Sequence, residues 1–169
     1  MRRGAISVCV VLSCVWAASC SPQGPHPAPD EERDPLATTS KLLEAHGLVG
    51  RTPDQRSPAE RDRPIDKALL RPLFSDLDDY EPFIADIYVG FVVGALAEHQ
   101  KRLFVSRQGL RSRVSAGQLD VQLKLEEGRW RIILAETIPE VIKKRAAAEK
   151  QRVVNESLGR AGSLSDQVQ

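Results

Sequence analysis

Residues 119–132, with the sequence LDVQLKLEEGRWRI, decide the fold class of this chain of 169 residues. In the first half of this stretch leucine or valine occupies every second position, with charged or amide side chains between. This alternation predicts a half-buried antiparallel strand, because successive side chains of a strand point to opposite faces. Residues 126–128, Glu-Glu-Gly, predict a three-residue hairpin loop with glycine in the left-handed conformation. Trp130 and Ile132 then continue the apolar face on a second strand, so Trp130 is expected to point inward.

The residues before this hairpin keep the two-residue period. Residues 103–107 predict one strand, which turns near Gln108-Gly109. Residues 111–114 predict another, which ends in a turn or bulge at Ala116-Gly117. Together with the hairpin, these strands predict a curved antiparallel meander.

Upstream of the meander, residues 83–105 are the most apolar part of the chain outside its N-terminus, and Ile87 to Ala97 carry no charge. Gly90 and Gly94 lie four residues apart, so on a helix they share a face and permit close packing. The run is shorter than the roughly 20 apolar residues that span a bilayer, which argues against a membrane helix. We therefore predict a buried central helix, and the β-branched residues leave a strand as the alternative.

Three further helices are predicted around this core. Asp34 caps the first, which runs to about His46, and Asp66 caps the second, which Pro72 shortens or kinks. Thr137 opens the third through a capping box, and this helix is expected to run to about Leu158. The expected docking faces are Leu36, Ser40, Leu42, Leu43 and Gly47 on the first helix, Leu69, Leu70, Leu73, Phe74 and Leu77 on the second, and Ile138, Val141, Ile142 and Ala146 on the third.

The predicted fold class is therefore α+β. N-terminal helices pack on a curved antiparallel β-meander, a C-terminal helix follows, and both termini are disordered. The predicted organisation is a signal peptide at 1–19, a proline-rich tether at 20–35, a single α+β domain at 36–158 and a disordered tail at 159–169.

The N-terminus has the pattern of an export signal. Two arginines at positions 2 and 3 precede an uncharged apolar stretch at residues 5–18, which is too short to span a membrane. Residues 17–20, Ala-Ala-Ser-Cys, resemble the bacterial lipobox, whose cysteine is acylated and becomes the first residue of the mature protein. Cleavage without acylation, which would release a secreted protein, is the alternative.

The lipobox resemblance implies that the chain is exported to a bacterial cell envelope and anchored to a membrane through acyl chains on Cys20. Of the two bacterial membranes, we favour the outer over the inner. Several acyl chains on one cysteine exceed the two signals that stable anchoring needs. Residues 21–35 contain five prolines and no large apolar side chain, so they predict an extended spacer between lipid and domain.

Composition excludes several classes of function. Lysine and arginine total 24 against 23 aspartate and glutamate, a balance that argues against nucleic acid as a partner. The three cysteines, Cys9, Cys14 and Cys20, all lie in the first twenty residues. The body of the chain therefore has no disulfide framework, no zinc cluster and no thiol nucleophile.

A second resemblance concerns the domain. Helices followed by a meander that ends in Glu-Glu-Gly-Arg-Trp-Arg-Ile, residues 126–132, resemble the nuclear transport factor 2-like superfamily, over about residues 36–145. That superfamily includes isomerases, dehydratases, carriers and binding modules, so the resemblance implies a cone-shaped cavity without assigning an activity. The side chains expected to line such a cavity as ligand-binding residues are Tyr88, Phe91, Leu96 and Trp130.

Four acidic side chains and three histidines are the candidates for metal chemistry. The acidic group at residues 76–81 lacks the glycine and distal glutamate of an EF-hand loop, so a solvated turn is expected instead. The histidines, His26, His46 and His99, are spread over separate segments, and we expect no metal and no cofactor.

An enzyme would use Asp86, Tyr88 or His99 as acid or base. On one continuous helix, however, Asp86 and His99 would stand about 20 Å apart. The basic residues of the outer strand face, which could bind an anionic envelope component, are expected to pair with nearby acids. The sequence thus favours a non-catalytic binding or assembly module that takes an envelope protein or a small apolar ligand, with a small-molecule isomerase or dehydratase as the alternative.

Overall fold

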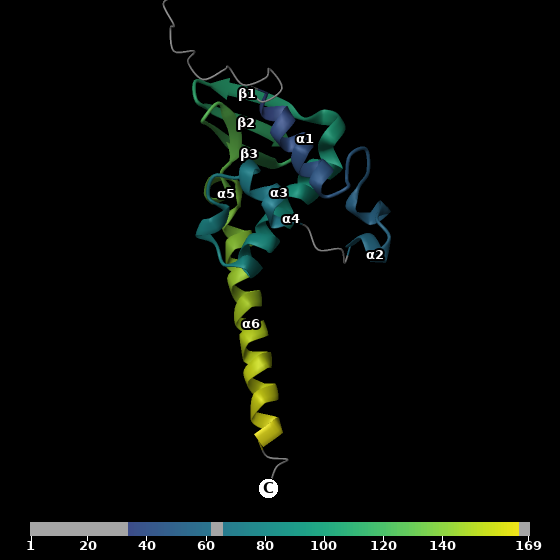
Figure 1. Cartoon of the computed structure of the whole chain (residues 1–169), viewed down its shortest axis with the longest axis vertical. Coiled ribbons are helices and arrows are strands. Elements are labelled where there is room, and N and C mark those ends of the chain that lie inside the picture. The colour runs from purple at the N-terminus through teal and green to yellow at the C-terminus, as the bar shows by residue number, and fades with distance from the viewer. Residues whose placement is uncertain (1–33, 62–65, 166–169) are drawn as a thin grey trace, which may run out of the picture.

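Four strands form one antiparallel sheet in the order β1-β2-β3-β4. They are β1 (Phe104–Gln108), β2 (Arg111–Ala116), β3 (Leu119–Glu126) and β4 (Arg129–Ile132). The computed structural model describes residues 34–61 and 66–165, and within them helices cover one face of this sheet (Figure 1). The predicted meander and the α+β class are confirmed.

The three hairpin turns depend on residues with positive φ. Gly109 and Gly117 have φ of 59° and 63° in the first two turns. The predicted three-residue loop between β3 and β4 is wrong, since Glu126 pairs with Arg129 and only two residues intervene. Both of these, Glu127 and Gly128, have positive φ, at 52° and 82°. A two-residue turn of this kind matches the right-handed twist of the strands it joins.

The sheet has one apolar and one charged face. On the inner face, Val114, Val121, Leu123 and Ile132 are fully buried, and Trp130 points inward as predicted. On the outer face, basic and acidic side chains pair across and beside the strands, which confirms the expected pairing. These ion pairs are Arg111–Glu136, Arg113–Asp120, Lys124–Glu126, Arg131–Glu126 and Arg131–Glu127.

Helix α4 (Pro82–His99) is the predicted central helix, and the strand alternative is wrong. It packs against α1 (Pro35–Ala45), the inner face of the sheet and α6 (Glu140–Ser165). Among the described residues, one helical stretch, Pro82–Arg102, has the length and composition to cross a membrane. Seven side chains of α4 are buried against the rest of the fold, as expected for a core helix, so this is weak support for a membrane span.

Helix α1 begins as predicted but buries a different face. The Asp34 carboxylate accepts a hydrogen bond from the backbone N–H of Leu36 at 3.1 Å, which caps the helix. Pro35, assigned to the tether, is the first helical residue and is buried. The buried face contains Thr38, Thr39, Leu42 and Leu43, whereas Ser40 is exposed. Threonine is accommodated there because its hydroxyl finds a buried acceptor: that of Thr38 donates to the carbonyl oxygen of Trp130 at 2.8 Å.

Short helical turns connect α1 to α4. Asp66 caps the second predicted helix, α3, as expected, and a 3-10 turn containing Pro72 ends it early. Because α3 has a single turn, Leu69 falls on its solvent side and is 58% exposed, contrary to the expected docking face. The bounds of these turns are η2 (Pro53–Gln55), α2 (Pro58–Arg61), α3 (Lys67–Leu70), η3 (Arg71–Leu73), η4 (Leu77–Asp79) and, after α4, η5 (Gln100–Arg102).

The predicted capping box at Thr137 is wrong. Thr137 ends the short helix α5 (Leu134–Thr137), and its hydroxyl accepts a hydrogen bond from the backbone N–H of Gln122 at 2.9 Å. The cap that sequence reasoning missed is Asp76. Its carboxylate oxygens accept from the backbone N–H groups of Leu134 and Ala135, at 2.9 and 2.8 Å, at the start of α5.

Helix α6 docks through its first half only. Ala146 is buried and Lys150 pairs with Glu81, the residue before α4, at 2.5 Å, whereas Val141, expected on the docking face, is 70% exposed. The helix then projects away from the rest of the described fold (Figure 1). It runs to Ser165 rather than ending near Leu158, because a glycine at position 159 weakens a helix without having to stop it.

Candidate functional site

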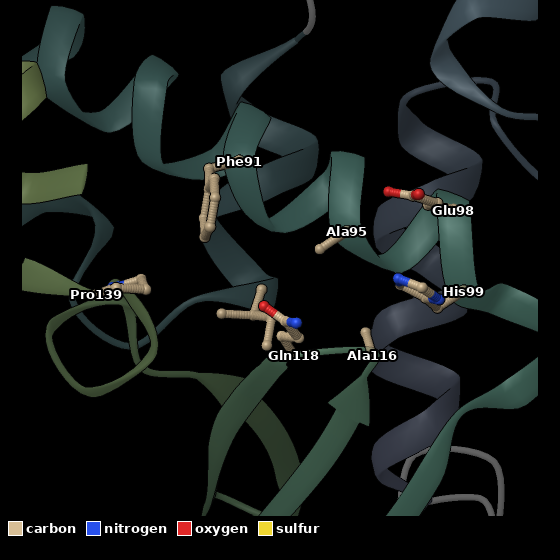
Figure 2. A pocket seen from close by; sticks show the side chains of 8 residues that line it. Phe91, Ala95, Glu98, His99, Ala116, Gln118 and Pro139 are labelled. Carbon is tan, nitrogen blue, oxygen red and sulfur yellow. The ribbon is translucent and has the colours of Figure 1, made fainter. Parts of the chain in front are cut away.

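A cleft of about 350 Å³ opens between α4, the β2–β3 turn and the residue that precedes α6 (Figure 2). We call it the α4–turn cleft. It is lined by Phe91, Ala95, Glu98 and His99 from α4, by Ala116, Gln118 and Leu119 around the turn, and by Pro139. Its volume lies at the lower end of the range for small-molecule sites.

Helical spacing explains why these α4 residues share the cleft. Phe91, Ala95, Glu98 and His99 lie at intervals of four, three and one residues, which places them on adjoining parts of one face. The buried residues of α4 occupy the neighbouring face, which packs on the sheet. The cleft therefore lies at the boundary between the packed face of α4 and the face that is open to solvent.

The β2–β3 turn approaches α4 closely because Gly117 has no side chain. A Cβ built on Gly117 would lie 2.3 Å from Nε2 of His99 and within 2.8 Å of two ring carbons. The imidazole thus rests against the glycine, which has a φ of 63°. Glycine meets two demands here, a left-handed backbone and space for the His99 ring.

Three polar side chains face or border this cleft without a partner. Among residues 34–61 and 66–165, the side chains of Glu98, His99 and Gln118 make no hydrogen bond or ion pair. Glu98 and Gln118 are exposed and His99 is half-buried, so a ligand could take the place of the water around these three side chains. The rest of the lining is apolar, and Figure 2 shows the ring of Phe91 directed into the space above the turn.

Of the four predicted ligand-binding residues, one lines the α4–turn cleft. Phe91 lines the α4–turn cleft, but Tyr88, Leu96 and Trp130 are buried in the core. Tyr88 and Leu96 do not line this cleft because they lie eight residues apart, on the face of α4 that packs inward. Tyr88 packs edge-on against Tyr80, with ring centroids 5.2 Å apart.

Trp130 is likewise buried in the core. It is 4% exposed, and the Arg107 guanidinium lies 5.9 Å from its ring centroid. Sequence reasoning could recognise that Trp130 points inward, but not that it lies in the core rather than in the lining of the α4–turn cleft.

The candidate acid–base residues are also separated. Asp86 and His99 stand near opposite ends of α4, which is continuous, so the expected separation of about 20 Å holds. Asp86 is exposed and pairs with Lys67 at 3.6 Å, while Tyr88 lies in the core. Of the three, His99 alone lines the cleft.

The acidic residues near α3 have structural roles. Asp76 caps α5, and Asp78 pairs with Arg71 at 3.2 Å. Within the described ranges, no group of three metal-ligating side chains gathers at one place.

His46 is a buried titratable residue that the sequence did not single out. It follows the last residue of α1, and its Nε2 atom is buried with no hydrogen-bond partner within the described part of the chain. Burial, together with the positive charge of Arg56, lowers the pKa of His46 from 6.5 to about 4. His46 is therefore neutral at neutral pH. Because the unfolded chain takes up this proton more readily than the folded chain, the free energy of unfolding should fall as the pH is lowered.

No family model matches the chain, and no curated protein or solved structure matches it. Its lipobox and its resemblance to the nuclear transport factor 2-like superfamily stay predictions from sequence. Cys20, the predicted lipid-attachment residue, lies outside the described residues.

Proposed function

We propose that this chain is an exported envelope lipoprotein whose domain binds a small, mostly apolar molecule in the α4–turn cleft without transforming it. The anchor is argued from the basic start, the short apolar stretch and the Ala-Ser-Cys sequence that ends at Cys20. The binding role is argued from the cleft.

One observation carries the binding role. A cleft of about 350 Å³ combines apolar walls with three polar side chains that lack partners among the described residues. Small-molecule sites have this composition, in which apolar contacts supply affinity and a few polar groups fix orientation. Phe91, Ala95, Leu119 and Pro139 supply the apolar surface, and Glu98, His99 and Gln118 supply the polar groups.

The alternative, an isomerase or dehydratase with a cone-shaped cavity, has less support. General acid–base catalysis needs its groups within hydrogen-bond reach of the same substrate. Asp86 and Tyr88 do not line the cleft, so His99 would act without either of its expected partners. Turnover of a small molecule that His99→Ala abolishes would favour the enzyme.

The binding role is tested by filling the cleft. Ala95→Leu adds three carbon atoms to its wall, and Ala148→Leu makes the same change at an exposed position of α6. Small molecules recovered with the purified protein from envelope extracts, and identified by mass spectrometry, are expected to disappear with Ala95→Leu and to remain with Ala148→Leu. Equal recovery from both variants would contradict binding in the cleft.

The anchor has its own test. Cys20→Ser removes the predicted acylation site, so the protein is expected to move from membrane pellets to soluble fractions. Continued pelleting of this variant would contradict lipid anchoring through Cys20, and it would leave the binding role to be decided by the Ala95 variants.

A further inference from the structure

The charge around the α4–turn cleft is one-sided. Among the eight residues that line it, Glu98 is the one acidic residue, and no lysine or arginine contributes to the lining. Lys101 and Arg102 follow on η5, but both are exposed and neither belongs to the lining. Within the described residues, the Glu98 carboxylate has no ion-pair partner.

The other polar groups of the cleft offer acceptors. The amide oxygen of Gln118 accepts hydrogen bonds, and the imidazole of His99 carries ring nitrogens that can take part in hydrogen bonds. The Glu98 carboxylate accepts only. A ligand group with several donors can therefore engage all three side chains, whereas a carboxylate would meet the negative charge of Glu98.

The apolar part of the cleft sets the size and shape of the ligand. At about 30 Å³ for each water-sized group, a volume of about 350 Å³ holds a molecule of up to about twelve non-hydrogen atoms. Phe91 lies on the α4 side of the cleft, across from Gln118 (Figure 2), and Leu119 adds further apolar lining.

We propose that the α4–turn cleft selects small organic amines, with the apolar body beside Phe91 and Leu119 and the protonated nitrogen facing Glu98, Gln118 and His99. This inference rests on the proposed binding role of the cleft. An ammonium group has three donors, which matches the three acceptor-bearing side chains. Because Glu98 lies at the exposed rim, its attraction is screened by water, and we expect a preference of about fivefold.

Three probes of matched size and different charge test this selection. They are 2-phenylethylamine, 2-phenylethanol and phenylacetate, each titrated into the isotopically labelled full chain while the amide shifts of Ala95 and Gly117 are followed by NMR. The amine is expected to bind about fivefold more tightly than the alcohol, and phenylacetate more weakly than either. Glu98→Gln is expected to give the amine the affinity of the alcohol, while Glu44→Gln, at an exposed position of α1, should leave the preference unchanged.

The outcomes separate this inference from the proposed function. Equal binding of the three probes, tighter binding of phenylacetate, or an amine preference that persists in Glu98→Gln would overturn the amine selection and leave the cleft as a binding site. Failure of all three probes to shift the cleft amides would overturn both.

Discussion

Replacing Gly117 by alanine is expected to destabilise the fold by about 2–4 kcal/mol, in two separable parts. The first part is backbone strain. A left-handed conformation costs a non-glycine residue about 1–2 kcal/mol, and this cost is partly offset by about 0.4–1 kcal/mol because alanine lowers the conformational entropy of the unfolded chain. The second is steric, because the new methyl group would lie 2.3 Å from Nε2 of His99 and the ring must move. Overpacking of this kind costs about 1–3 kcal/mol.

Gly109 provides the matched control. It occupies the β1–β2 turn with a φ of 59°, close to the 63° of Gly117, but no heavy atom lies within 4 Å of a Cβ built there. Gly109→Ala should therefore show the strain alone, about 1 kcal/mol.

Chemical denaturation of both variants, and of Gly117→Ala combined with His99→Ala, gives the steric part as a coupling energy. In the His99→Ala background, the Gly117 substitution should cost about as little as Gly109→Ala. If Gly117→Ala and Gly109→Ala are equally stable in the presence of His99, the imidazole does not rest on the β2–β3 turn, and the geometry of the cleft is wrong.

Three further perturbations test the fold. Trp130→Ala should lower the free energy of unfolding by about 3–5 kcal/mol, because it empties a buried site on the inner face; an unchanged melting temperature would show that this face is wrongly assigned. Asp76→Ala should cost about 1–2 kcal/mol by uncapping α5, whereas Asp78→Ala, which breaks an exposed pair, should cost less than about 1 kcal/mol; equal effects would contradict the cap. Because the pKa of His46 is lowered in the folded state, the unfolded chain binds this proton first, and the free energy of unfolding should fall by up to about 3 kcal/mol as pH drops from 6.5 to about 4. His46→Gln should reduce this dependence of the free energy of unfolding on pH. An unchanged dependence would contradict the burial of a neutral imidazole.

The sequence predicted what depends on periodicity and local caps. Alternation over residues 119–132 was enough for the sheet and for the direction of Trp130, because a strand with one buried face cannot shift register without exposing its apolar side chains. Asp34 and Asp66 were recognisable as caps because each bonds a backbone N–H only two residues ahead.

Features that depend on long-range placement were missed. Asp76 caps a helix that begins 58 residues later, and the Thr137 hydroxyl serves the backbone of Gln122 rather than its own helix. The cleft joins α4, a hairpin turn and Pro139, which no local pattern relates. Two features of the sequence pointed towards this cleft. They are the helical spacing that puts Phe91 and His99 on one face of α4, and the glycine at the β2–β3 turn.

The most direct test of the central claim is an amide shift map of the full chain in the presence of a small molecule recovered with it from envelope extracts. Binding in the α4–turn cleft predicts that the largest changes fall at Ala95, His99, Gly117 and Gln118, and that they vanish in Ala95→Leu while persisting in Ala148→Leu. Changes centred on the exposed half of α6 or on β1, or changes that survive Ala95→Leu, would contradict the cleft as the binding site.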